Sequence, residues 1–442
     1  MTGSKKLYLL LALTVIPYAL SGLYPPLATL GTAYNICLLV LLVIDYQLTA
    51  RPGQLSISRS ISDRLSIGRS NQVLITVTNN SASNLTIRLR DDFPESIQTD
   101  TETFEFQLPS SGTSTLEYKL TPRRRGAYQF GNVTLRYLSY LGLFWRQRVE
   151  KTPASVKVFS DLKALHDLSI KLAKSSELGE LHQRKRGQGT DFASLREYTS
   201  GDDAKAIDWK ATARRDRPVI RTYEAEQEQR LLVLIDAGRM MVSDLEGLTR
   251  FDHALNSALC LALTGLTHND QVGMGAFADK PLMYLPPRRG KTYMKSILEN
   301  TFALEPRMVE PDYVGMLSYF ASNQKGRSLI VVLTDLTDPT GSQALLAGIA
   351  GLSTRHLVFC VTLKDRQIIN SAKPQILPAN APNEEVMGSI YRRAVATDLL
   401  EQRELALSVL QRRGCLVLDC PPQELSDKLV DAYLEVKTRG RL

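Results

Sequence analysis

Two aspartates occupy positions at which a sheet protein commonly binds a ligand. Asp236 follows the apolar run 231–235, and Asp335 follows a second, mainly apolar run, 328–334. Such runs predict strands that are buried on both faces and belong to a parallel sheet covered by helices. Since open α/β sheets bind ligands at the carboxyl ends of their strands, the two carboxylates would meet at one edge if the strands are neighbours. Two carboxylates placed there could hold Mg²⁺ or activate a water molecule.

The spacing around these aspartates resembles the von Willebrand factor A domain and its metal-ion-dependent adhesion site. That family has a strand ending in D-x-S-x-S, a later threonine in a loop, and another strand ending in T-D. The chain keeps both aspartates, whereas the loop threonine would fall within 310–313, where Asp312 stands. The resemblance implies a partner-binding or degenerate metal site made of Asp236, Gly238, Met240, Asp312, Thr334 and Asp335.

Two of the ligands that such an adhesion site needs are missing. Gly238 supplies no hydroxyl group, and Met240 supplies a soft thioether that Mg²⁺ does not favour. We therefore expect no functional metal and no cofactor, with weak Mg²⁺ binding as the alternative. Without a metal, the two aspartates would be structural, bonded to backbone N–H groups or paired with a base such as Arg239 or Lys210.

The usual sequence patterns of catalytic sites are missing. The sequence has no G-x-S-x-G elbow, no P-loop and no H-E-x-x-H, and its five histidines and five cysteines are scattered. We therefore expect a non-enzymatic scaffold or adaptor that holds a protein partner at the carboxyl edge of the sheet. The alternative is a metal-dependent hydrolase that uses Asp236 and Asp335.

The most distinctive pattern lies between residues 187 and 224. It resembles the signature of the family called domain of unknown function 58, which is G-x-G-x-[ED]-F-x-x-L-R-x-Y followed by G-D-D, I-D-W and A-R. The resemblance implies a bacterial, membrane-anchored protein with a von Willebrand A-like domain, often encoded near a MoxR-type AAA+ ATPase, which would be the partner. The signature residues are Gly187, Gly189, Asp191, Phe192, Leu195, Arg196, Tyr198, Gly201, Asp202, Asp203, Ile207, Asp208, Trp209 and Arg214.

The same stretch is strongly charged, with ten Lys or Arg and six Asp or Glu residues between 184 and 223. Basic side chains interleaved with aromatic ones could bind nucleic acid through the segment 184–221. Because an acid lies within a few residues of most bases, we instead expect a brace over the edge of the sheet, and no nucleic acid. Trp209 would bury its ring against the sheet, while Asp208 and Arg214 pair at the rim.

The N-terminal region predicts a membrane anchor. Residues 7–44 carry no charge, and one helix of that length would extend about 57 Å, well beyond a ~30 Å hydrocarbon core. Pro25-Pro26 divides this run, which predicts a hairpin of two transmembrane helices at about 7–23 and 27–44. Basic residues on both sides indicate that the hairpin's ends, and the soluble part, lie in the cytoplasm of a multi-pass inner-membrane protein. A signal peptide is the alternative.

Composition and patterning set the remaining expectations. The 442 residues are 43% hydrophobic and 23% charged, which is typical of a globular chain with two or three domains, and the net charge of +8 suits an anionic surface such as a membrane. Short alternating segments predict an antiparallel β-sandwich, and the later alternation of strands and helices predicts a doubly wound, mostly parallel α/β sheet of von Willebrand A-like fold. We expect a hairpin at 1–50, the sandwich at 51–160, the signature segment at 161–230 and the α/β domain at 231–442.

Overall fold

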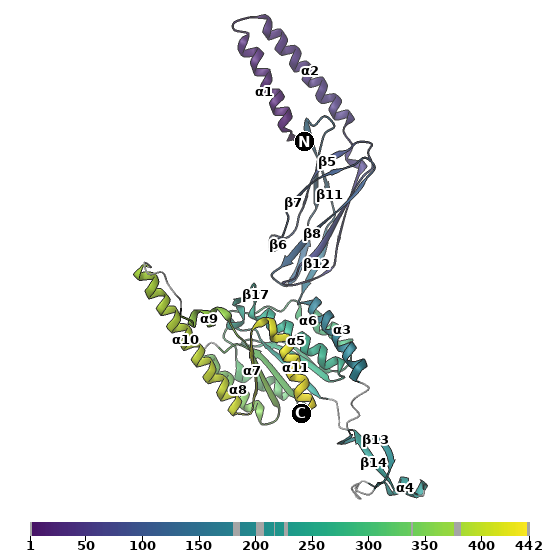
Figure 1. Ribbon diagram of the computed structural model, residues 1–442, viewed down its shortest axis with the longest axis vertical. Helices are drawn as coiled ribbons and strands as arrows, with labels where there is room; N and C mark the ends of the chain where they lie inside the picture. Colours follow the sequence, from purple (N-terminus) through teal and green to yellow (C-terminus); the bar gives the residue numbers. More distant parts are fainter. Residues whose placement is uncertain are drawn as a thin grey trace. The chain divides into compact units, whose positions relative to one another are not determined.

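The computed structural model describes residues 2–179, 186–199, 207–215, 217–224, 229–336, 339–374 and 382–439 (Figure 1). The chain divides into two compact units, Met1–Phe159 and Ser160–Leu442. The first unit contains two helices followed by mostly antiparallel sheets, and the second contains a six-stranded α/β sheet.

The first unit begins with two helices, α1 (Lys5–Leu20) and α2 (Pro26–Leu48), which lie side by side (Figure 1). Among the described residues, one helical segment, Pro26–Gln54, is long and apolar enough to cross a membrane. α1 has 16 residues and is about 24 Å long, less than a ~30 Å hydrocarbon core requires. The prediction of two spans in a multi-pass protein is therefore corrected to one apolar N-terminal helix, of the kind found in membrane anchors and in signal sequences.

Antiparallel pairing dominates the sheets of the first unit, as the alternating pattern predicts. Their strand orders are β1-β11-β10-β5-β7, β2-β4-β8-β6 and β3-β12-β9, and the pair β3 and β12 is parallel. In β4 the alternate residues Val73, Ile75 and Val77 are fully buried, because successive side chains of a strand point to opposite faces. The strands are β1 (Thr2–Gly3), β2 (Leu55–Ile61), β3 (Arg64–Ser66), β4 (Asn71–Asn79), β5 (Leu85–Asp91), β6 (Ile97–Thr99), β7 (Thr103–Leu108), β8 (Thr113–Pro122), β9 (Gly126–Phe130), β10 (Val133–Leu138), β11 (Phe144–Glu150) and β12 (Ala154–Phe159).

The main sheet of the second unit has the order β19-β18-β15-β20-β21-β22. Its neighbours pair in parallel except β18 and β19, which are antiparallel, so the predicted mostly parallel sheet is confirmed. The strands are β15 (Arg230–Asp236), β18 (Gln271–Phe277), β19 (Pro281–Arg288), β20 (Leu329–Thr334), β21 (Leu357–Leu363) and β22 (Leu416–Cys420).

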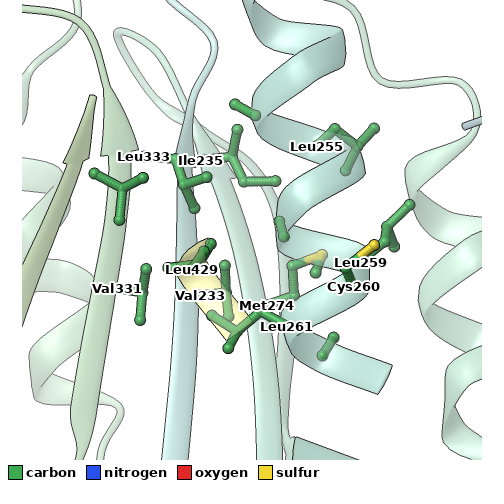
Figure 2. Close-up of a cluster of buried hydrophobic side chains, with 14 of the residues drawn as sticks. Val233, Ile235, Leu255, Leu259, Cys260, Leu261, Met274, Val331, Leu333 and Leu429 are labelled. Carbon is green, nitrogen blue, oxygen red and sulfur yellow. The ribbon is translucent and has the colours of Figure 1, made fainter. Parts of the chain in front are cut away.

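Helices cover both faces of this sheet, which is why its central strands are mostly apolar. Val233 and Ile235 of β15 pack into one buried cluster with side chains of α5 and α11, and Figure 2 shows them beside Leu255, Leu259 and Leu429. The intervening Leu232 and Leu234 pack into a second cluster with α7 and α8. The helices are α3 (Leu162–Gly179), α5 (Arg250–Thr267), α6 (Tyr293–Thr301), α7 (Tyr313–Ser322), α8 (Pro339–Ser353), α9 (Arg366–Ala372), α10 (Asn383–Arg412) and α11 (Pro422–Thr438).

Candidate functional site

The two predicted aspartates lie at the same edge of the sheet. β15 and β20 are parallel neighbours with Ile235 opposite Leu333, so Asp236 lies level with Thr334 and one position before Asp335. Both side chains are buried, with 0% and 4% of their surface exposed. A buried carboxylate needs hydrogen-bond or ion-pair partners, and each of the two has a separate set.

Asp236 is held by three donors. Its Oδ1 accepts a hydrogen bond from Gly238 N at 2.7 Å, and its Oδ2 accepts one from Tyr313 Oη and one from Thr334 Oγ1, each also at 2.7 Å. Burial raises the pKa of Asp236, while the bonds from Tyr313 and Thr334 act in the opposite direction. Burial and the nearby Asp236 carboxylate also raise the pKa of Tyr313, which keeps its hydroxyl protonated as a donor.

Gly238 is required by packing at this turn. Its backbone is extended, with φ −80°, so a larger residue would meet no backbone strain there. A Cβ atom on Gly238 would instead lie 2.7 Å from Cδ of Pro311 and 3.0 Å from its Cγ, closer than side chains normally approach. The position that holds a serine in the adhesion-site pattern could therefore hold one here only if the turn shifted.

Asp312 does not join Asp236. Its exposed side chain caps α7 by accepting a hydrogen bond from Gly315 N at 2.9 Å, which is the usual role of an aspartate at a helix N-terminus. Tyr313, the next residue, turns inward and supplies the hydroxyl that reaches Asp236. Met240 lies half-buried in the short 3-10 helix η3 (Arg239–Val242). The structure thus brings together Asp236, Gly238 and Thr334 of the six predicted residues.

Asp335 belongs to a network of ion pairs. Arg250 Nη1, at the start of α5, donates to its Oδ2, and Arg403 Nη1, in α10, donates to its Oδ1 at 2.7 Å. Leu336 N also donates to Oδ1, at 2.9 Å. Asp335 is thus bonded to a backbone N–H group and paired with bases, as a structural aspartate was expected to be, and the bases are Arg250 and Arg403.

The two arginines extend the network to neighbouring strands. Arg250 Nη2 donates to Asp365 Oδ2 at 2.9 Å, and Arg403 Nη2 donates to Asp419 Oδ1 at 2.7 Å. Burial lowers the pKa of Arg250, and the Asp365 carboxylate opposes that shift. Thr362 Oγ1 adds a bond of 2.9 Å to Asp419. The network therefore ties β20, β21 and β22 to α5 and α10 at the edge where a ligand would be expected.

Few side-chain oxygens at this edge of the sheet are left to bind a metal ion. The described part of the chain contains no group of three or more His, Cys, Asp and Glu side chains arranged to hold a metal ion. The aspartates' oxygens instead face hydroxyl, amide and guanidinium donors, and those arginines would repel a cation. Arg239 of the same loop pairs with Glu310 at the surface.

The signature segment forms a hairpin of its own. β13 (Arg186–Glu197) and β14 (Val219–Glu224) pair in an antiparallel two-stranded sheet, and α4 (Trp209–Arg215) lies between them in the chain. Asp208 accepts hydrogen bonds from Lys210 N at 3.1 Å and Ala211 N at 3.2 Å, so it caps α4. The predicted residues Gly201, Asp202 and Asp203 lie outside the described residues.

Trp209 contradicts the expectation of a buried ring. Its side chain is 71% exposed, and Trp209 is the first residue of the short helix α4. The residues Lys210 and Arg214 of the same helix are also exposed. The hairpin therefore presents an aromatic side chain together with basic ones.

Residues 194–373 match the family model described as "Protein of unknown function DUF58". The range matched to DUF58 contains both buried aspartates and Arg250, and it ends before Arg403. "Uncharacterized protein Rv1480" from Mycobacterium tuberculosis is 22% identical over 181 residues, which are 40% of this chain and 56% of that protein. "Uncharacterized protein YeaD" from Bacillus subtilis is 30% identical over 132 residues, 28% of this chain and 31% of that protein. The chain thus spans about half, or less, of the length of these curated relatives.

Solved structures give weaker likenesses. The crystal structure of the conserved hypothetical protein BatB from Bacteroides thetaiotaomicron matches with a TM-score of 0.29 and 14% identity, over 48% of this chain and 100% of that chain. A PapD-like domain of human CEP192 matches with a TM-score of 0.19 and 12% identity, over 25% of this chain and 89% of that chain. TM-scores this low support no conclusion about the fold or function of residues 194–373.

Proposed function

We propose that the protein is a membrane-anchored, non-enzymatic adaptor whose von Willebrand A-like domain binds a protein partner without a bridging metal ion. The observation that carries this proposal is an apolar stripe on α10. Met387, Ile390 and Tyr391 are 67%, 58% and 73% exposed, and their spacing puts them on one face of the helix. Large apolar side chains gathered on a surface favour a protein contact.

The hydrogen bonds of the two buried aspartates support the same proposal. Each carboxylate oxygen of Asp236 and Asp335 accepts at least one hydrogen bond from within the protein. A hydrolase would need at least one of these groups to reach water or a metal ion. The partner class that the DUF58 resemblance implies is a MoxR-type AAA+ ATPase, and we extend the proposal to it.

The anchor in this proposal is α2, with the soluble part in the cytoplasm. The helix has 23 residues, about 35 Å, so it can cross a ~30 Å hydrocarbon core. Alkaline carbonate extraction of membranes tests this part: an anchored protein stays in the pellet and enters solution only with detergent. Release by carbonate alone would contradict the anchor.

Partner binding is tested with the purified full-length protein in detergent and the purified AAA+ ATPase encoded nearest to it. The variant carries Met387→Ser, Ile390→Ser and Tyr391→Ser. We expect its dissociation constant to rise at least about tenfold, because central apolar contacts carry most of the binding energy. The matched control carries Met308→Ser and Val314→Ser, which are 77% and 47% exposed and lie outside α10. Equal affinities of the two variants would contradict the role of the stripe.

A second function, binding of single-stranded nucleic acid, is favoured by one observation, the exposed ring of Trp209. Bases stack on exposed aromatic rings, and nearby lysine and arginine side chains contact phosphates. Binding through this hairpin would weaken steeply as salt concentration rises, because counterions are released on association.

A further inference from the structure

The two helices of the first unit are fastened to its sheets through one loop, residues 139–144, which we call the junction loop. At the start of α1, Ser4 N donates to Leu143 O at 2.9 Å and Ser4 Oγ donates to Gly142 O at 2.6 Å. At the end of α2, Thr49 Oγ1 accepts a hydrogen bond from Tyr140 N at 3.1 Å. The first residues of α1 and the last of α2 therefore meet at the same level of the unit.

Asp45 strengthens this junction from the last turn of α2. Its side chain is fully buried, and Oδ1 accepts a hydrogen bond from Leu141 N at 2.7 Å while Oδ2 accepts one from Leu143 N at 3.4 Å. Its backbone carbonyl also accepts hydrogen bonds from N and Oγ1 of Thr49. The carboxylate that ends the apolar helix is thus turned into the protein and shielded from its surroundings.

The groups left on the outside of the junction are basic and aromatic. Lys5 and Lys6 at the start of α1 and Arg51 after α2 are exposed. On the junction loop, Tyr140 is 62% exposed. A carbon atom added to Gly142 would lie 3.4 Å from Lys6 Nζ, so this ammonium group lies beside the loop.

The exposed charged residues at the two helix ends of the junction are all basic. Asp45 is the one acidic residue among the first 62 of the sequence, and its carboxylate is the buried one. Aromatic side chains with a polar end are favoured at the level of lipid headgroups, and lysine and arginine there attract anionic lipids. The composition of the junction fits a headgroup layer better than it fits bulk water.

We infer that the junction is a binding surface for anionic phospholipid headgroups, with Lys5, Lys6 and Arg51 contacting the phosphates and Tyr140 lying among the headgroups. This inference rests on the proposed membrane anchor α2, which brings the junction to the bilayer surface. Because both helix ends are bonded to the junction loop, headgroup binding holds the sheets of the first unit close to the membrane.

The test uses the full-length protein in dodecyl maltoside micelles, to which phosphatidylglycerol or phosphatidylcholine is added while the melting temperature is followed. The test variant carries Lys5→Gln, Lys6→Gln and Arg51→Gln. We expect phosphatidylglycerol, and not phosphatidylcholine, to raise the melting temperature of the parent. The variant should need at least about tenfold more phosphatidylglycerol for half of that rise, since each basic residue near an anionic surface contributes severalfold in affinity.

The matched control removes three exposed basic residues from the far end of the sheets. Lys119→Gln, Arg123→Gln and Arg124→Gln lie at or beyond the end of β8 that pairs near Asn71, whereas the junction lies near Leu55, at the opposite end of the neighbouring strands. This control should respond like the parent. Equal loss of the response in both variants, or an equal response of the parent to both lipids, would overturn the inference. Carbonate extraction of the parent reports separately on the anchor, so a failed anchor is distinguished from a failed headgroup site.

Discussion

Tyr313 donates its hydroxyl hydrogen to Asp236 across 2.7 Å at the carboxyl edge of the parallel sheet. The same hydroxyl lies 2.9 Å from Thr334 Oγ1. Replacement of Tyr313 by Phe leaves the ring packed against Phe277 but removes one donor from a fully buried carboxylate. We expect the free energy of unfolding to fall by about 1–3 kcal/mol, measured by urea denaturation. Tyr319→Phe, at a ring that is 42% exposed, is the control and should change it little.

Gly238→Ser tests whether this edge could regain a metal site. The serine Cβ would lie 2.7 Å from Pro311 Cδ, so the turn must shift, and we expect a loss of about 1–3 kcal/mol in unfolding free energy. Calorimetry with Mg²⁺ should show weak binding or none in the parent, and the substitution should not improve it. Gly351→Ser is the control, since a Cβ there meets no atom within 4 Å. A dissociation constant for Mg²⁺ in the low micromolar range, in either protein, would contradict the prediction that this edge binds the ion weakly or not at all.

The Asp335 network predicts a larger effect on stability. Arg403→Met keeps much of the side chain's length but leaves two aspartates without one of their buried partners. Breaking a buried pair from one side typically costs about 3–5 kcal/mol, and we expect a loss of that size in urea denaturation. Arg412→Met removes the same charge from the exposed last turn of α10 and should cost well under 1 kcal/mol. A similar loss in both variants would mean that the network contributes no more than a surface charge.

Local patterns were enough to predict the strands and the meeting of the aspartates. Residues 231–235 and 329–333 are uninterrupted apolar runs, and the aspartate near the end of each marks the carboxyl edge of a parallel sheet. Short alternating segments likewise predicted antiparallel strands in the first unit, and in β4 and β5 buried residues alternate with more exposed ones.

The partners of those aspartates could not be predicted, because they come from distant parts of the chain. Tyr313 is 77 residues from Asp236, and Arg403 is 68 residues from Asp335. An arginine within a helix usually faces solvent, and nothing in the local pattern of α10 shows that Arg403 is buried. The steric need for Gly238 depends on Pro311, which only the folded turn brings near.

Trp209 gives the most direct contrast between sequence and structure. A rare tryptophan after Ile207-Asp208 suggests a buried ring, yet the ring is 71% exposed. Substitutions of exposed residues usually change stability by less than about 0.5 kcal/mol, so Trp209→Ala should melt close to the parent. Phe320→Ala, at a fully buried ring, should cost about 3–5 kcal/mol and shows that the assay detects a core truncation.

The variant Trp209→Ala also tests whether the exposed ring binds nucleic acid or a protein. If Trp209 stacks on nucleic acid, the parent binds oligo-dT with a steep salt dependence and Trp209→Ala binds more weakly. If the hairpin serves a protein contact, neither protein binds oligo-dT. A clear drop in the melting temperature of Trp209→Ala would mean that the ring is buried after all.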